Sequence, residues 1–196
     1  MKSHMKDQCN ACRAEVSSYD GVYLTARGHS RFLCSKCYNE SISEEFGLDF
    51  NHISFHPMTL RDRDGVDHTF HFQTRLFGDN VNIQALEIKE GNPKGYVFSE
   101  HGDVEDDLFG LFAKLVDRLR RELERKHIEP SDLLRYQITN QNIVRGHIAW
   151  DDETGGETPC LIIDGKEISW HEFGRMLMTY EGFHFKLEIF EGSEER

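Results

Sequence analysis

The sequence predicts an α+β protein in which a small N-terminal four-cysteine module precedes a two-layer body with mostly antiparallel strands and two main helices. Three observations lead to this prediction. Two Cys-x2-Cys pairs stand in the first 40 residues. Several later stretches alternate apolar and polar residues, as half-buried strands do, and two others repeat apolar residues at helical spacing. With 38% apolar and 30% charged residues among its 196, the chain has the composition of a globular protein.

The chain is expected to divide into three pieces. Residues 1–46 form the cysteine module, residues 47–130 a β-meander with a long amphipathic helix, and residues 131–196 a unit with a hairpin, a helix and a strand. The last two pieces are either one body or two separate domains, since both are within the size range of small domains. The sequence leaves these two arrangements open.

The chemistry of the cysteine module depends on two pairs of thiols, Cys9 with Cys12 and Cys34 with Cys37. Two residues between thiols let both sulfurs reach one metal ion, and two such pairs complete a tetrahedron. A closed set of four thiolates suits zinc in a structural role. Two disulfides or four unrelated thiols are the alternatives, and the lack of an export signal argues against disulfides. The sequence therefore predicts one structural zinc ion bound by these four residues.

With these cysteines, and with a helix expected to start near Cys37 and to end at Gly47, residues 9–46 resemble zinc-binding modules of the treble-clef and zinc-ribbon type. A short hairpin, residues 18–33, is expected to carry the second cysteine pair back to the first. The resemblance implies that the module contacts a protein or a nucleic acid, or stabilises a neighbouring domain. The rest of the chain resembles no characterised family.

The N-terminus gives an expectation about location. Residues 1–8 contain no apolar region of a secretion signal, and no stretch of the chain approaches the roughly 20 apolar residues that cross a bilayer. A cytoplasmic protein without a membrane partner is therefore expected. Met1 to His4 are interpreted as a cloning remnant ahead of a native Met5, because Ser-His-Met is a common vector scar.

The middle piece begins with a predicted meander. Residues 54–60 and 67–77 flank a cluster of turn residues at 61–65 and predict a hairpin. Residues 81–89 predict a third strand and residues 95–99 a fourth. In the second strand, the apolar face carries Phe70, Phe72 and Leu76, and the polar face carries His71, Gln73 and Arg75.

A long amphipathic helix is expected within residues 103–127. Asp103 is its expected N-cap, and basic residues crowd toward its C-terminal end, as the helix dipole favours. Its apolar stripe at helical spacing consists of Leu108, Leu111, Phe112, Leu115, Leu119 and Leu123.

The C-terminal piece is expected to open with two strands, residues 144–150 and 159–164, followed by a tight turn at Gly165. Trp150 and Trp170 lie beside apolar runs, so both are expected in the core. Cys160 does not belong to the two cysteine pairs and is expected to be an inert thiol in a buried strand.

A helix and a strand are expected to follow. Ser169 and Glu172 form a capping box that starts the helix, which should end near Gly182. Residues 183–190 then predict a strand with a buried face made of Phe183, Phe185, Leu187 and Ile189.

One group of residues is a candidate catalytic site. Asp79, followed by a strand with Glu87 and Lys89, resembles the metal-binding core of the PD-(D/E)XK nucleases. The resemblance implies two carboxylates that hold Mg²⁺ and a lysine that positions the attacking water. Alternation does place Glu87 and Lys89 on one face of the strand. However, no proline precedes Asp79, and a strand end that becomes polar explains the same residues.

The net charge of −12 argues against a nucleic acid as the partner, because such binding needs a basic surface. The sequence therefore favours a non-enzymatic cytoplasmic zinc protein that binds or regulates another protein. A metal-dependent nuclease or hydrolase with Asp79, Glu87 and Lys89 remains one alternative, and nucleic-acid binding through the cysteine module remains another. Neither the oligomeric state nor the identity of the partner is predicted.

Overall fold

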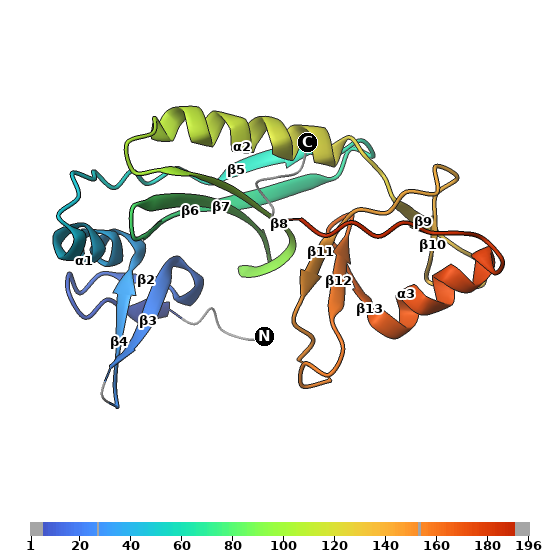
Figure 1. Ribbon diagram of the computed structural model, residues 1–196, viewed down its shortest axis with the longest axis horizontal. Helices are drawn as coiled ribbons and strands as arrows, with labels where there is room; N and C mark the ends of the chain where they lie inside the picture. The colour runs from blue at the N-terminus through green and yellow to red at the C-terminus, as the bar shows by residue number, and fades with distance from the viewer. Residues whose placement is uncertain (1–5, 27, 153, 191–196) are drawn as a thin grey trace.

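A computed structural model describes residues 6–26, 28–152 and 154–190, so the interpretation of Met1 to His4 concerns residues outside the described part. In the described ranges, three α-helices and several small antiparallel sheets make an α+β fold, which confirms the predicted class (Figure 1). None of the helices in these ranges is both long and apolar enough to cross a membrane.

The cysteine module consists of two hairpins and a helix. The β3–β4 hairpin joins the two cysteine pairs, as the sequence predicts. Helix α1 ends at Gly47, whose φ of 66° is the left-handed conformation that glycine adopts readily. The elements are β1 (Lys6–Gln8), β2 (Glu15–Ser17), the 3₁₀ turn η1 (Ser18–Asp20), β3 (Gly21–Ala26), β4 (His29–Cys34) and α1 (Ser35–Phe46).

The middle of the chain folds into the predicted antiparallel meander, with strand order β5-β6-β7-β8. Its strands are β5 (Met58–Arg61), β6 (Asp67–Phe77), β7 (Asn80–Lys89) and β8 (Asn92–Asp103). The turn between β5 and β6 is closed by the side chain of Asp62, which accepts hydrogen bonds from the N–H groups of Asp64 and Val66. The cluster of turn residues is thus a hairpin turn.

Helix α2 (Leu108–Leu123) begins later than the sequence predicts. The N-cap is Asp107, whose carboxylate accepts hydrogen bonds from two backbone N–H groups of the first turn. The prediction of Asp103 as the cap is wrong, because Asp103 still belongs to β8, where it pairs with Asn80. Strand pairing therefore outweighs the local preference of this aspartate for a helix start.

The main core lies between α2 and one face of the sheet (Figure 1). The predicted apolar face of β6 and the predicted stripe of α2 meet there, and buried residues of β7 complete the cluster. Its buried members are Phe70, Phe72, Leu76, Val81, Ile83, Ala85, Leu108, Leu111, Leu115, Val116, Leu119 and Leu123.

The cysteine module covers the edge and the second face of β6. Strand β5 pairs only with residues 67–70, so the rest of that edge has no strand beside it in the described part of the chain. Asn39 of α1, which is fully buried, donates a hydrogen bond to the carbonyl of Thr74 (2.7 Å) and accepts one from the N–H of Leu76 (3.0 Å). One side chain thus satisfies the two backbone groups that a neighbouring strand would satisfy.

The predicted polar face of β6 does not face water. Gln73 and Arg75 both donate hydrogen bonds to the carbonyl of Tyr19 in the cysteine module, and Gln73 is only 2% exposed. The polar residues on this face therefore hold the module against the sheet.

We expect the substitution Asn39→Ala to lower the free energy of unfolding by about 2–4 kcal/mol, because it leaves two buried backbone groups without partners. The matched control is Glu40→Ala, one residue along α1, which removes only an exposed ion pair with Lys36 and should cost under about 0.5 kcal/mol. Urea unfolding followed by circular dichroism measures both changes. Equal stability of the two variants would contradict the proposed role of Asn39 at the edge of β6.

The C-terminal third contains two small sheets and the third helix. The β9–β10 hairpin has no counterpart in the sequence prediction, since its strands are only three residues long. The elements are β9 (Ile128–Pro130), β10 (Tyr136–Ile138), β11 (His147–Ala149), β12 (Cys160–Ile163), β13 (Lys166–Ser169), α3 (Trp170–Leu177) and the 3₁₀ turn η2 (Met178–Tyr180).

Helix α3 starts where the sequence predicts. The hydroxyl of Ser169 accepts a hydrogen bond from the N–H of Glu172 (3.1 Å). Gly165 has a φ of 65°, as the predicted tight turn requires. The α-helix ends earlier than predicted, however, because the chain tightens into the 3₁₀ turn η2 after Leu177, and η2 ends at Tyr180.

Two predictions for this third are wrong. Residues 183–190 pair with no strand in the described part of the chain, and their apolar side chains are exposed. Trp150 and Trp170 are 70% and 49% exposed, so neither belongs to the core. Alternation predicts a strand only if an edge is available to pair with it, and the folded chain does not place residues 183–190 against an edge.

Candidate metal centre

The four paired cysteines lie together in the structure. Their sulfur atoms are all within 4.8 Å of one another, and Cys12 Sγ lies 3.8 Å from Cys34 Sγ. Sulfurs bound at about 2.3 Å to a tetrahedral ion would be about 3.8 Å apart. The cluster therefore has the size that a single metal ion with four thiolate ligands requires.

Local backbone structure places each pair. Between Cys9 and Cys12 the chain turns back on itself: the N–H of Arg13 donates to the carbonyl of Cys9, and Arg13 has a φ of 65°. Cys34 immediately precedes α1, and Cys37 lies in the first turn of that helix. The β3–β4 hairpin between the pairs returns the chain to its start, so the second pair meets the first.

The environment favours a thiolate at Cys9. Burial raises the pKa of the Cys9 thiol, but hydrogen bonds from backbone N–H groups, first that of Cys34, outweigh burial and lower the pKa to about 6. For Cys37, burial dominates and raises the pKa. The thiolate is the species that binds metals, so the N–H groups around Cys9 suit a metal ligand.

Cys160 is not part of the cluster. It lies in β12, half-buried, with its sulfur 3.6 Å from the carbonyl of Ile168. Burial raises the pKa of this thiol, which is the direction expected for an inert cysteine.

The structure separates the candidate nuclease residues. Asp79 lies in the turn before β7, where its carboxylate accepts a hydrogen bond from the amide of Asn80. Glu87 lies near the opposite end of that strand, roughly 27 Å along the chain at about 3.4 Å per residue. Lys89 does lie beside Glu87, with Nζ 3.0 Å from Oε1. The predicted group of two carboxylates and a lysine is therefore not brought together.

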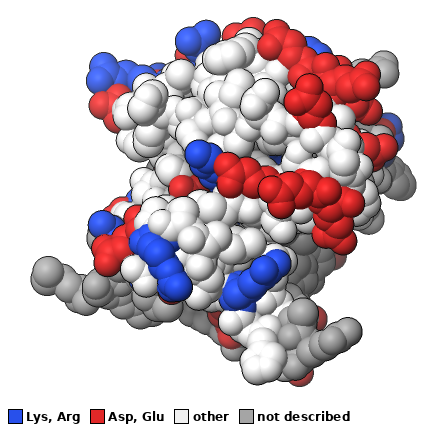
Figure 2. Space-filling view, turned by 90° about the vertical axis from the view of Figure 1, so that its left-hand side faces the viewer, with Lys and Arg blue, Asp and Glu red and all other residues white. Residues whose placement is uncertain are grey.

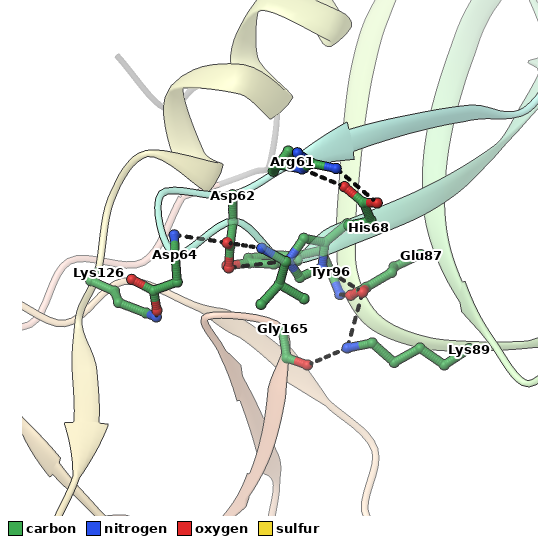
Figure 3. A network of polar contacts seen from close by, with 11 residues as sticks. Arg61, Asp62, Asp64, His68, Glu87, Lys89, Tyr96, Lys126 and Gly165 are labelled. Atoms are coloured by element: carbon green, nitrogen blue, oxygen red, sulfur yellow. Dashed lines mark hydrogen bonds and ion pairs between the residues drawn. The ribbon is translucent and has the colours of Figure 1, made fainter.

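Glu87 instead belongs to a buried polar joint (Figure 3). Its carboxylate, on a side chain only 1% exposed, lies 2.7 Å from Nδ1 of His68 and accepts a hydrogen bond from the N–H of Tyr96 (2.9 Å). The ring of His68 also lies 3.3 Å from a carboxylate oxygen of Asp62. Hydrogen bonding to Glu87 raises the pKa of His68, since the protonated ring lies between two carboxylates.

An irregularity in the sheet makes room for this joint. The β7–β8 register shifts between Leu86 and Ile88, so the N–H of Tyr96 meets the Glu87 carboxylate. Gly95 has a φ of 109°, and a Cβ there would lie 2.0 Å from Glu87 Oε2. The carboxylate thus occupies space that only glycine leaves open.

The same joint connects the middle sheet to the C-terminal third. Lys89 donates a hydrogen bond to the carbonyl of Gly165 in the β12–β13 turn (3.1 Å). A Cβ at Gly165 would lie 2.7 Å from the Tyr96 ring, so the turn packs directly on that ring. In the same turn, Asp164 accepts hydrogen bonds from the N–H groups of His127 and Ile128 (2.9 Å each).

Closed packing indicates a structural role for this joint, because a catalytic carboxylate must be accessible to its substrate. No sequence motif marks His68, Asp62 or Tyr96 as members of a site. A signal was available for His68, which stands two residues before Phe70 and therefore on the apolar face of its strand.

Comparison with known proteins assigns no activity to the chain. Three family models match consecutive stretches of the chain, and each is described only as a domain of unknown function: DUF7685 at residues 8–49, DUF7686 at residues 51–124 and DUF7713 at residues 127–194. No curated protein and no solved structure matches the chain.

Proposed function

We propose that this chain is a cytoplasmic, zinc-stabilised protein-interaction protein without catalytic activity, in which one structural zinc ion is bound by Cys9, Cys12, Cys34 and Cys37. The observation that carries the proposal is the cluster of four sulfurs at the spacing a tetrahedral zinc ion requires. The position of Cys34 and Cys37 at the start of α1 supports a module of the treble-clef type. A closed set of four thiolates leaves no ligand position for a substrate, so the ion has a structural role.

The small core of the module supports the same role for the metal. Besides the cysteines, the buried apolar side chains of the described module are Phe32 and Leu33, with a few half-buried residues around them. So few buried apolar groups do not stabilise a module of about 40 residues without an additional cross-link. Zinc would hold the module in the form that covers the edge of β6.

The surface around α1 favours a basic protein segment as the partner. Figure 2 views the end of the molecule on which α1 lies, where acidic side chains gather in a band. Exposed carboxylates of this region include Glu40, Glu44 and Glu45 of α1. Such a surface repels nucleic-acid phosphates and attracts lysine- or arginine-rich segments.

Affinity capture from native extract tests the proposal. The full chain should retain a protein with a basic segment, and a charge-reversed variant should lose it; the reversed positions are Glu40→Lys, Glu44→Lys and Glu45→Lys. A control variant changes the net charge equally at exposed positions of the C-terminal third: Asp132→Lys, Asp152→Lys and Glu157→Lys. Equal loss from both variants would contradict a site on α1. Recovery of the chain alone would contradict the proposed partner.

A further inference from the structure

The C-terminal segment, residues 183–190, has the pattern of a strand but no partner. Its apolar residues alternate with His184, Lys186 and Glu188. The apolar side chains are far more exposed than such residues are in a folded domain: Phe183 is 70% exposed, Phe185 90%, Leu187 73% and Ile189 74%. Together they present about 500 Å² or more of apolar surface, which is as large as the largest patches of ordinary monomers.

The same third of the chain contains a sheet edge that matches this segment. Its three-stranded sheet has the order β11-β12-β13, and no strand in the described ranges pairs with the outer edge of β11. Ile148 stands opposite Leu161, so it lies on the sheet face that packs against α3. Ile148 and Trp150, two residues apart and thus on one side, are 54% and 70% exposed. A further strand beside β11 would cover both.

We propose that the partner of this edge is a second copy of the chain: residues 183–190 of each copy add to the β11 edge of the other. Both halves of the contact are in one chain, so a two-fold exchange satisfies both at once and closes as a dimer. The two segments together carry about 1,000 Å² of exposed apolar surface, which is of the order that a specific interface buries.

Local charge permits this pairing although the chain carries −12 overall. Within the segment, Lys186 pairs with Glu188, and His184 is the remaining polar residue of the alternating face. The apolar face can therefore be buried without burying an unpaired charge.

Light scattering coupled to size-exclusion chromatography, over a series of concentrations, tests the exchange in the full chain. The wild-type chain should have twice the mass of one chain. A segment variant with Phe185→Glu and Leu187→Glu should be monomeric, and so should an edge variant with Ile148→Glu and Trp150→Glu. The control is His184→Ser, on the polar face of the same segment, which should remain dimeric.

A mixture of the two monomeric variants distinguishes an exchange of residues 183–190 from other ways of forming a dimer. The segment variant retains a normal edge and the edge variant retains a normal segment, so one of the two contacts should form and a heterodimer should appear. Circular dichroism and zinc content of each variant show whether it is folded. A wild-type monomer, a dimer that survives in the edge variant, or a mixture without heterodimer would each overturn the proposal. These results do not depend on the acidic surface of α1.

Discussion

The substitution Cys34→Ser is expected to abolish binding of the proposed zinc ion and to unfold the cysteine module, because structural zinc contributes apparent free energies of about 10–16 kcal/mol in small modules. The amides at the edge of β6 should also lose their protection from hydrogen exchange, since Asn39 reaches Thr74 and Leu76 only from a folded α1. Hydrogen exchange followed by mass spectrometry measures the effect on each strand. Strands β7 and β8 should keep most of their protection, because their core is formed with α2.

The matched control for this change is Cys160→Ser, which removes the cysteine outside the cluster. It should leave about one zinc ion per chain and unchanged exchange in β3 and β4. If Cys34→Ser protein keeps the same zinc content as this control, the assignment of four thiolate ligands is wrong. If the whole sheet exchanges as fast as the module, zinc stabilises the entire fold.

The substitution Glu87→Ala is expected to lower the free energy of unfolding by about 3–5 kcal/mol, the usual result of removing one partner from a buried charged pair. It leaves Nδ1 of His68 and the N–H of Tyr96 without their partner. The contact between Lys89 and Gly165 should weaken as well, so amide hydrogen exchange in the β12–β13 turn should become faster. Circular dichroism is the suitable probe of unfolding, because both tryptophans are exposed and report little on burial.

The control for Glu87→Ala is Asp79→Ala, at the other end of β7, where the carboxylate is exposed and the cost should stay within about 0.5 kcal/mol. A similar loss in both variants would contradict the structural joint.

The pH dependence gives a second readout of the joint. Hydrogen bonding to Glu87 raises the pKa of His68 above 6.5. The contribution of His68 to the free energy of unfolding is therefore fully present below pH 6.5 and is lost as pH rises through the raised pKa. Burial raises the pKa of Glu87, but hydrogen bonds from His68 and Tyr96 outweigh burial and lower it below 4.5. The contribution of Glu87 is therefore lost as pH falls through the lowered value. Between pH 4.5 and 6.5 both groups stabilise the fold. The loss of stability as pH rises above this range should be much smaller in the Glu87→Ala variant.

The predictions that succeeded depend on interactions close together in the sequence. Cys-x2-Cys spacing by itself allows two sulfurs to reach one ion, and the four sulfurs do cluster. The alternation in β6 selects one apolar face whatever lies against it, and Phe70 and Phe72 are buried. The helix start at Ser169 needs only residues three positions apart.

The predictions that failed depend on partners far away in the sequence. Asp103 has the chemistry of a cap, but pairing with Asn80 decides its conformation. Nothing near Asn39 indicates that its amide reaches β6, thirty-five residues later. Likewise, the sequence around Glu87 does not reveal that His68 and Tyr96 enclose it, which is why an accessible catalytic carboxylate was a reasonable hypothesis.

The contact between Asn39 and β6 has a consequence for the order in which the protein forms during synthesis. The cysteine module precedes β6 in the chain, so it leaves the ribosome earlier and can bind metal and fold before the residues of β6 emerge. When β6 emerges, its unpaired edge can then pack at once against a folded cysteine module. Without the proposed zinc ion this order would fail at its first step, and each nascent chain would expose the unpaired edge of β6 to other nascent chains. We therefore expect metal supply to determine the yield of native protein more than its stability once made.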